Sequence, residues 1–436
     1  MKPYLASLAL VVSFGAFAQA QPKPQAQTPL PAASPESVGM STQRLAKINA
    51  ALKKEVADGS FRGAVVMVAR KGKLVYSDAV GMQTADKPMR TDTVFRIYSM
   101  TKPLVSVAAM MLVEDGTLQL TDPVGKFLPG FDKMQVSVAT KAAEGTAYSN
   151  VPAERPMTVQ DLLRHTSGLA YGEITQNAPV KEGYEKAGLY RKDLDYESRG
   201  VTPAEQIERL AAVPLAFQPG TTWHYSLSSD VLGRVVEAAS GKRLGDFLQE
   251  RLFRPLRMRD TAFSVPTAKR ARLAEPLAND RFSGRPNKLI DVSEPPKNDS
   301  GGAGAVSTAG DYLRFAQMLM NGGALDGARV MSRTTVRLMT SDHLGNFIQQ
   351  PVQPGELLLG TKGYSFGLGF AVRQADGVGG VHGSAGEFMW AGYAGTYFFV
   401  DPKESLTAVL MTQAPSPNRA YFRKMLKQLV YQAIVD

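Results

Sequence analysis

The hydrophobic pattern has a helical spacing at the first structured stretch of the chain and a strand-like character directly after it. Apolar residues recur every three or four positions over residues 41–57, which predicts a helix with one apolar face. Two apolar runs, at 65–69 and 74–79, flank the polar residues 70–73. Such a pair of runs around a short turn predicts a β-hairpin.

The rest of the pattern separates a helical middle from a strand-rich end. Helical spacing, with capping residues before it or glycine after it, predicts helices at about 99–115, from 158, from 202, and at about 229–239, 309–321 and 419–435. Short apolar runs predict strands at 368–372, 388–391, 395–400 and 406–412. Residues 172–200 and 343–363 show no clear periodicity, so we expect loops there that could lie over a site.

Strands at both ends with helices between them predict the class α/β (α+β), with an antiparallel sheet formed from both termini and flanked by helices. We expect residues 37–85 and 300–436 to form a sheet lobe. Residues 86–299 would form a large, mostly helical inserted lobe. A chain of 436 residues is long enough for two such lobes.

The first residues have the composition of an export signal. Lys2 precedes an apolar run over 5–17, and Ala18-Gln19-Ala20 has the small-x-small pattern of a cleavage site. We therefore expect residues 1–20 to be a signal peptide cleaved after Ala20, and the mature protein to be periplasmic or secreted without a stable membrane partner. Residues 21–36 are rich in proline and glutamine and are expected to be a flexible leader.

Composition excludes several classes of chemistry. The chain has no cysteine, which excludes disulfides and thiol catalysis, and its four histidines are dispersed without metal-ligand spacing. We expect no metal and no other cofactor. The net charge of +10 comes without any run of five basic residues, so we expect a mildly basic surface rather than a nucleic-acid site. The oligomeric state is left open.

The strongest candidate chemistry is Ser99-Met100-Thr101-Lys102, at the predicted start of an apolar helix. A serine hydroxyl needs an adjacent base at neutral pH, and residues three apart on a helix share a face, so Lys102 can reach Ser99. The Ser-x-x-Lys pattern is typical of serine β-lactamases and penicillin-binding proteins. No other serine in the chain is followed by lysine at that spacing.

Two further segments could complete such a site. Tyr225, in Tyr225-Ser226-Leu227, precedes a predicted helix, and a phenol with a pKa of about 10 can act as a base at neutral pH only beside a cation. In Trp390-Ala391-Gly392-Tyr393, the small residues would allow a substrate carbonyl to approach the backbone. An N–H there, opposite the Ser99 N–H, would form a two-donor oxyanion hole.

Histidine is the weaker alternative as the base. No Gly-x-Ser-x-Gly motif is present, and His165, in His165-Thr166-Ser167-Gly168, is more typical of a helix-ending turn than of a catalytic base. His382, in His382-Gly383-Ser384, lies in a glycine-rich connection. It stays open as an alternative third motif that would make the site more polar.

In this order the three segments resemble the motifs of class C β-lactamases and, more closely, of the related family VIII carboxylesterases. Supporting stretches at 162–169, 301–308 and 395–402 are similar to the same family, and the resemblance spans about residues 37–436. It implies a serine β-lactamase-like fold. It also implies that Ser99 is acylated, that Lys102 and Tyr225 share the proton transfer, that the Ser99 and Tyr393 N–H groups form the oxyanion hole, and that Trp390 lines the pocket.

Two departures from the β-lactamase pattern indicate the substrate. Trp390 stands where those enzymes usually carry lysine, and Leu227 where they usually carry asparagine, which would bind the substrate's amide side chain. Both changes favour neutral, apolar esters, so we expect a secreted serine carboxylesterase acting on short-chain or small-acid esters. The alternatives are a class C-like β-lactamase, a D-amino-acid peptidase or an acyltransferase of the same superfamily. A catalytically silent cell-wall-binding protein is a further alternative.

Overall fold

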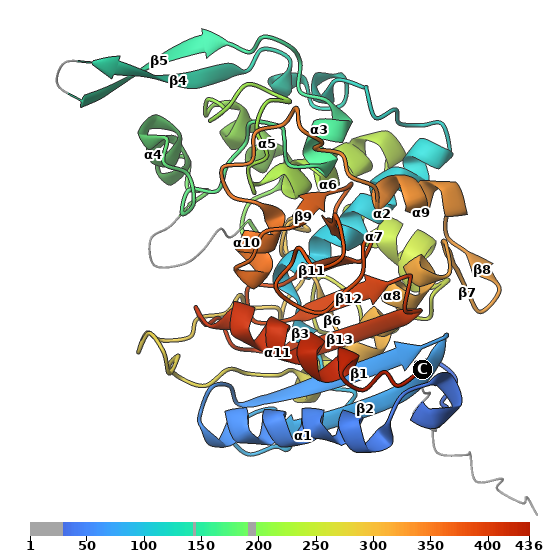
Figure 1. Cartoon of the computed structure of the whole chain (residues 1–436). Helices are drawn as coiled ribbons and strands as arrows, with labels where there is room; N and C mark the ends of the chain where they lie inside the picture. The colour runs from blue at the N-terminus through green and yellow to red at the C-terminus, as the bar shows by residue number, and fades with distance from the viewer. Residues whose placement is uncertain (1–28, 143–144, 191–197) are drawn as a thin grey trace, which may run out of the picture.

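Strands from the two ends of the chain hydrogen-bond side by side in one antiparallel sheet (Figure 1). Its order is β2-β1-β13-β12-β11-β10-β9, and the contact between the two ends is β1 against β13, with Val66 facing Leu410. The strands are β1 (Gly63–Arg70), β2 (Lys73–Gly81), β9 (Tyr364–Phe366), β10 (Ala371–Arg373), β11 (Phe388–Ala391), β12 (Tyr397–Asp401) and β13 (Leu406–Thr412). The predicted class and the sheet built from both termini are confirmed.

The computed structural model describes residues 29–142, 145–190 and 198–436. The expected signal peptide, residues 1–20, lies outside these residues, so export and cleavage after Ala20 stay predictions. The expected flexible leader, 21–36, is described only from residue 29. Its last part packs against β2, because Ala33 N–H donates to the Leu74 carbonyl at 3.0 Å and Leu30 is buried. The described part of the expected leader therefore contacts the sheet, and its flexibility stays a prediction.

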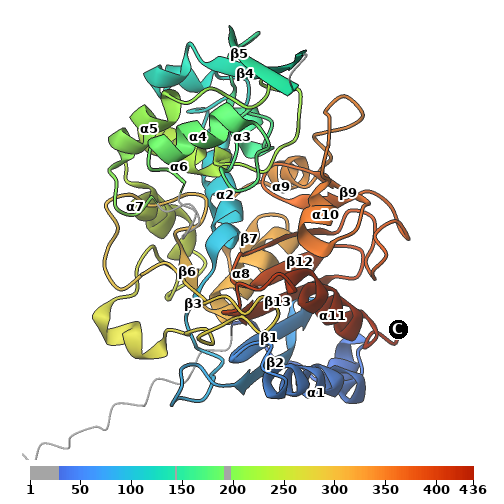
Figure 2. The same ribbon diagram turned by 90° about the vertical axis from the view of Figure 1, so that its left-hand side faces the viewer.

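Helices cover both faces of the sheet and fill the region above it (Figures 1 and 2). Helices α1 and α11 pack together on one face, and α8 packs on strands β1, β12 and β13 of the sheet. The helices are α1 (Thr42–Ala57), α2 (Thr101–Glu114), α3 (Val159–Leu163), α4 (Ala178–Lys186), α5 (Pro203–Ala211), α6 (Ser228–Ser240), α7 (Leu244–Leu248), α8 (Ala309–Met320), α9 (Arg333–Met339), α10 (Pro354–Leu359) and α11 (Arg419–Tyr431). None of these described helices is long and apolar enough to cross a bilayer.

Helix α2 has a central position because it is apolar on every side. All residues from Thr101 to Leu112 are buried, and the helix packs against α6 and α7. A helix without a polar face is stable only when other elements surround it. This burial fixes the first turn of α2, which carries Lys102, within the core of the molecule.

Several short elements were not predicted. The region expected to be mostly helical contains the hairpin of β4 (Gln135–Ala142) and β5 (Gly145–Pro152), at the top of Figure 1. Helices α4 and α10 lie within the two stretches expected to be loops. Strand β9 precedes the first strand expected in the C-terminal region, at 368–372. Helix α4 buries only Val180 and Tyr184, and α10 is six residues long. Both are too short for an apolar period to stand out.

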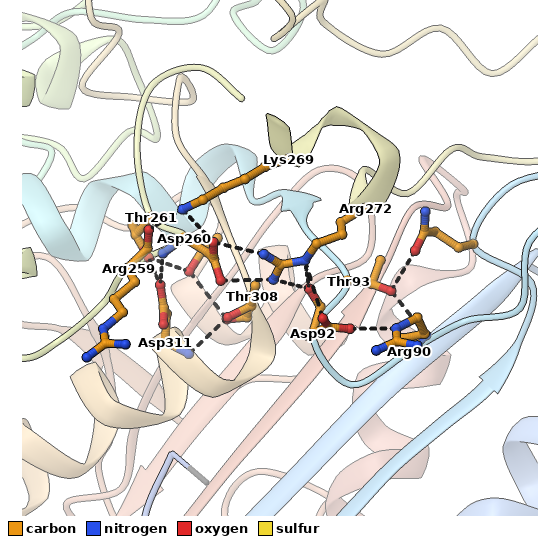
Figure 3. A network of polar contacts seen from close by, with 12 residues as sticks. Arg90, Asp92, Thr93, Arg259, Asp260, Thr261, Lys269, Arg272, Thr308 and Asp311 are labelled. Carbon is orange, nitrogen blue, oxygen red and sulfur yellow. Dashed lines mark hydrogen bonds and ion pairs between the residues drawn. The ribbon is translucent and has the colours of Figure 1, made fainter. Parts of the chain in front are cut away.

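A polar network holds the segment that leads toward Ser99 (Figure 3). Arg272 donates to the Asp92 carbonyl and, at 2.8 and 3.0 Å, to the Asp260 carboxylate. The backbone N–H of Asp260 in turn donates to Asp311 Oδ2 at 2.7 Å, in the first turn of α8. The network therefore ties residues 90–93 to the helix that supports the sheet.

Within this network Asp311 makes the stability of the fold depend on pH. Burial, together with the charge of neighbouring Asp260, raises the pKa of Asp311 to about 6. Between about pH 4 and pH 6 the folded chain keeps a proton that the unfolded chain releases, so the free energy of unfolding falls as pH rises, by at most about 3 kcal/mol. We expect Asp311→Asn to lose less stability over this range, as measured by urea unfolding at pH steps from about 4.5 to 7.5. Parallel curves for both proteins would show that Asp311 titrates alike in the folded and unfolded states.

Candidate active site

Ser99 lies in a tight turn between a short strand and α2. Strand β3 (Phe95–Arg96) pairs with β6 (Val306–Ser307), and the 3₁₀ turn Tyr98–Met100 follows it directly. The predicted helix thus begins at Thr101, two residues later than expected, and Ser99 precedes it. Tyr98 has a left-handed backbone with φ of 45°, a conformation that costs free energy for a residue with a side chain. The Ile290 N–H donates to the Tyr98 hydroxyl at 2.9 Å, which helps hold this turn.

Lys102 points from the first turn of α2 toward Ser99 and has no access to bulk solvent. Only 1% of its surface is exposed. Its Nζ donates to Ser99 Oγ at 3.2 Å, to the Tyr171 hydroxyl at 3.0 Å and to the Gly302 carbonyl at 2.7 Å. An ammonium group has three donors, and here each of them has an acceptor. The structure therefore brings Lys102 to Ser99 as the motif spacing predicts.

Tyr225 reaches Ser99 from a segment 126 residues further along the chain. It lies just before α6, and its hydroxyl donates to Ser99 Oγ at 2.6 Å. Its ring is 4.8 Å from Lys102 Nζ and packs on Trp390 with the ring centroids 5.5 Å apart. Ser99 Oγ therefore has two neighbours that can take its proton, one phenol and one amine.

A second tyrosine, Tyr171, belongs to the site and was not singled out from the sequence. Its hydroxyl accepts from Lys102 Nζ, and its ring packs against Tyr225 at 5.2 Å between centroids. It follows the stretch 162–169 by two residues, so the resemblance of that stretch was a signal that could have found it. Tyr171 holds Lys102 from the side opposite α2, and its hydroxyl lies next to the reacting groups.

His165 lies close to the site but does not contact Ser99. It is buried, and its Nδ1 is 3.2 Å from Ser226 Oγ. Burial, and then the charge of Lys102, holds the pKa of His165 well below its usual range. A neutral imidazole hydrogen-bonded to Ser226 supports the backbone around Tyr225, because the His165 ring packs on Tyr225 at 5.2 Å.

The segment Trp390–Tyr393 forms the wall beside the Ser99 turn. A side chain at Gly392 would place its Cβ 2.4 Å from the Ile97 carbonyl, so only glycine lets this segment approach the turn. The sequence predicted that small residues here would admit a substrate carbonyl. In the structure, the group that Gly392 accommodates is the carbonyl of the chain's own Ile97. Arg423 donates to the Gly392 carbonyl at 3.0 Å, and Arg419 to the Tyr393 carbonyl at 2.7 Å. Two arginines of α11 therefore hold the two peptides that flank Tyr393.

These groups line one cavity of about 330 Å³. Ser99, Tyr225, Trp390, Gly392 and Tyr393 are all among its lining residues. Most of the remaining wall is apolar or aromatic, contributed by Tyr98, Tyr171, Ile174, Ala303, Leu357, Leu358 and Ala391. The cavity therefore combines a serine with two adjacent bases and a largely apolar surface.

Two expectations about this cavity need correction. Leu227, expected to contact substrate, does not line it, because its backbone begins α6 and its side chain is buried in the core. His382, kept open as an alternative third motif, lies elsewhere, where its ring stacks on Tyr431 with the centroids 6.0 Å apart. Trp390 is therefore the third-motif residue that lies in the cavity with Ser99.

The cavity also keeps positive charge, which the sequence comparison of the third motif did not reveal. Arg419 and Arg423 lie four residues apart on α11, so both face it from the same side. Burial, and then the charge of Arg419, lowers the pKa of Arg423 to about 9. Replacing the usual lysine by Trp390 therefore removes one cation without leaving the site uncharged. The i, i+4 arginine pair on the last predicted helix was the available signal.

Among the residues that the structure describes, no group of three or more His, Cys, Asp or Glu side chains is placed to hold a metal ion.

Comparison with known proteins agrees with this geometry. The model of the family described as Beta-lactamase matches residues 48–432. The chain is 36% identical to Protein Rv1367c of Mycobacterium tuberculosis over 380 residues, covering 84% of this chain and 89% of that protein. It is 31% identical to Esterase EstB of Burkholderia gladioli over 394 residues, covering 84% of this chain and 90% of that protein.

Among solved structures, the chain is similar to EstCE1, described as a hydrolase with promiscuous acyltransferase activity. The TM-score is 0.70 at 27% sequence identity, and the match covers 90% of this chain and 99% of that one. Simvastatin synthase (LovD) from Aspergillus terreus superposes with a TM-score of 0.73 at 24% identity, covering 90% of this chain and 98% of that one. The expected β-lactamase-like fold is thereby confirmed.

Proposed function

Because the chain belongs to the Beta-lactamase family, we propose that it is a carboxylesterase that cleaves short-chain or small-acid esters through an acyl-enzyme on Ser99. The broader assignment, a β-lactamase-like serine hydrolase with esterase and acyltransferase relatives, follows from the family and from EstB and EstCE1. The preference for esters, the roles of individual residues and the export of the chain are our proposals.

One observation carries the proposal: Ser99 Oγ lies 2.6 Å from the Tyr225 hydroxyl and 3.2 Å from Lys102 Nζ. A nucleophile and its base within hydrogen-bond reach are the signature of covalent catalysis. Binding alone would not require a buried amine and a phenol to converge on one serine. A catalytically silent binding protein is therefore the weaker interpretation.

In the proposed reaction, Ser99 Oγ attacks the ester carbonyl carbon while its proton passes to the Lys102–Tyr225 pair. The negative charge that develops on the carbonyl oxygen is stabilised by the N–H groups of Ser99 and Tyr393. The bond to the alcohol oxygen then breaks, and the pair returns the proton to the departing alcohol. Water repeats the sequence on the acyl-enzyme and releases the carboxylic acid, which leaves Ser99 free.

Arg423 and Arg419 contribute to this proposal through the backbone. The Arg423 hydrogen bond to the Gly392 carbonyl orients the peptide that carries the Tyr393 N–H, and the Arg419 hydrogen bond to the Tyr393 carbonyl holds the next peptide, Tyr393–Ala394. A preorganised donor stabilises a developing oxyanion without reorganising during the reaction. The arginines would thus hold one half of the oxyanion hole in place.

Trp390 and Leu227 favour esters over β-lactams. Trp390 presents an aromatic wall where β-lactamases usually place a cation, and Leu227 offers no amide to the cavity because it is buried in the core. An enzyme that lacks the buried polar partners of a substrate group loses selectivity for that group by orders of magnitude. A neutral acyl group of a few carbons suits a cavity of about 330 Å³ with mostly apolar walls.

The decisive measurement compares two substrate classes on the same preparation. We expect p-nitrophenyl butyrate to be hydrolysed with a kcat/KM at least about 100-fold higher than that for nitrocefin. Absorbance assays follow both reactions. Absence of ester turnover would reject the esterase proposal, whereas nitrocefin turnover comparable with that of the ester would favour a β-lactamase.

A further inference from the structure

Besides Ser99 and Tyr171, Lys102 contacts a backbone carbonyl that has no role in the proposed reaction. Its Nζ donates to the Gly302 carbonyl at 2.7 Å, which is its shortest hydrogen bond. A carbonyl only accepts, whereas Ser99 and Tyr171 each have a hydroxyl that can also donate. The Gly302 carbonyl therefore sets the position of the amine more strictly than the other two partners do.

The turn that presents this carbonyl is held by one buried carboxylate, Asp230, in the first turn of α6. Asp230 Oδ1 accepts from Ser300 Oγ at 2.6 Å and from the Gly302 N–H at 3.2 Å. Asp230 is completely buried. A side chain at Gly302 would place its Cβ 2.1 Å from Asp230 Oδ2, so the turn lies directly on the carboxylate. Displacing Asp230 would therefore move the carbonyl that receives Lys102.

Asp230 also places a buried carboxyl group near the amine. Its Oδ2 has no hydrogen-bond partner among the described residues. Arg234, one turn further along α6, forms an ion pair with Glu237 at 2.8 Å. Burial raises the pKa of Asp230, while the charges of Lys102 and Arg234 and the hydrogen bonds from Ser300 and Gly302 act in the opposite direction.

The other titratable groups near Lys102 are placed differently. Tyr171 and Tyr225 present their rings to Nζ at 5.5 and 4.8 Å between Nζ and centroid. His165 is buried and interacts unfavourably with the charge of Lys102, as its lowered pKa shows. Glu173 lines the cavity beside Tyr171, whereas Asp230 is the carboxyl group that holds the turn bonded to Lys102.

We propose that Asp230 is a positioning residue for the nucleophile: it fixes the Gly302 carbonyl against Lys102 and places a buried carboxyl group near the amine. This inference rests on the proposed function only in taking Ser99 as the reactive serine.

The test measures how readily Ser99 reacts with a fluorophosphonate as a function of pH. Ser99 Oγ forms a bond to phosphorus, fluoride leaves, and the serine proton passes to the base, so labelling needs no ester turnover. Intact-mass spectrometry of the full-length protein gives the rate. In Asp230→Asn, whose side-chain oxygen can still accept from Ser300 and Gly302, we expect the plateau rate to fall at least about fivefold. The midpoint of the rising pH limb should move down by about one pH unit, because the amide removes the carboxyl group that interacts with Lys102.

Two further variants separate charge from packing. Asp311→Asn changes another buried aspartate, whose hydrogen bonds go to Asp260, Thr261 and Thr308, and should leave both the plateau and the midpoint unchanged. Ser300→Ala keeps the carboxylate but removes the 2.6 Å hydrogen bond that holds the turn. It should lower the plateau at least about threefold with less movement of the midpoint than Asp230→Asn shows. If Asp230→Asn does not fold, Ser300→Ala decides, and an unchanged plateau in it overturns the proposal.

The outcomes distinguish this proposal from the proposed function. A wild-type protein that is labelled on Ser99 but inert toward esters would reject the esterase and leave the role of Asp230 intact. A lower plateau in Asp230→Asn with an unmoved midpoint would reduce Asp230 to a structural residue. An unchanged profile would overturn its role alone, and a wild-type Ser99 that is never labelled would overturn both.

Discussion

Replacing Ser99 with alanine is expected to lower ester hydrolysis at least about 10⁴-fold, to the background rate of the assay. The substitution removes the oxygen to which both the Tyr225 hydroxyl and Lys102 Nζ are directed. Neither neighbour can replace Ser99 as the nucleophile, because the proposed role of the Lys102 amine and the Tyr225 phenol is to accept the serine's proton. The residual cavity still binds the ester but has no group to form the acyl-enzyme.

The measurement is kcat/KM for p-nitrophenyl butyrate, together with intact mass after mixing with substrate. Wild type is expected to show the mass of an acyl adduct, and Ser99→Ala none. Ser106→Ala provides a matched control, because Ser106 is a buried serine on α2, one helical turn after Lys102. Activity that persists in folded Ser99→Ala would place the nucleophile elsewhere and end the present assignment.

The parts of the site that could be predicted are those that local spacing dictates. Ser99 and Lys102 are three residues apart, so a helical turn alone brings them together. The order of the helices and strands followed from hydrophobic period, and the sheet formed from both ends followed from where the strands lie in the sequence. Each of these predictions depends on residues that are close in sequence or on a pattern repeated over many positions.

The parts that could not be predicted depend on tertiary structure. Asp230 reaches Lys102 only through the turn at Gly302, which is 200 residues from Lys102 in sequence. Arg423 faces the cavity because α11 packs on α10, and the buried pair Lys427–Glu387, at 2.5 Å, joins α11 to the residue that precedes β11. No local sequence motif predicts such a contact. Conversely, Leu227 matched a motif position, but its backbone enters α6 and turns the side chain into the core.

Replacing Tyr225 with phenylalanine is expected to lower kcat/KM for p-nitrophenyl butyrate by about 10²- to 10⁴-fold, the usual contribution of a positioned acid–base group. The hydroxyl is the closest polar group to Ser99 Oγ, at 2.6 Å, and it is the proposed route by which the proton reaches the departing alcohol. Phenylalanine keeps the ring that packs on Trp390 and lies over Lys102 Nζ. The fold and the shape of the cavity should therefore survive, with a melting temperature close to that of the wild type.

Tyr171→Phe is the matched control for this change. It also removes a hydroxyl from the same cavity, but that hydroxyl contacts Lys102 at 3.0 Å and is not hydrogen-bonded to Ser99. We expect a loss of about tenfold or less, because Lys102 keeps its bonds to Ser99 and Gly302. A larger loss in Tyr225→Phe than in Tyr171→Phe would assign the proton transfer to the phenol that touches the nucleophile. Near-normal activity in folded Tyr225→Phe would instead leave Lys102 as the sole base.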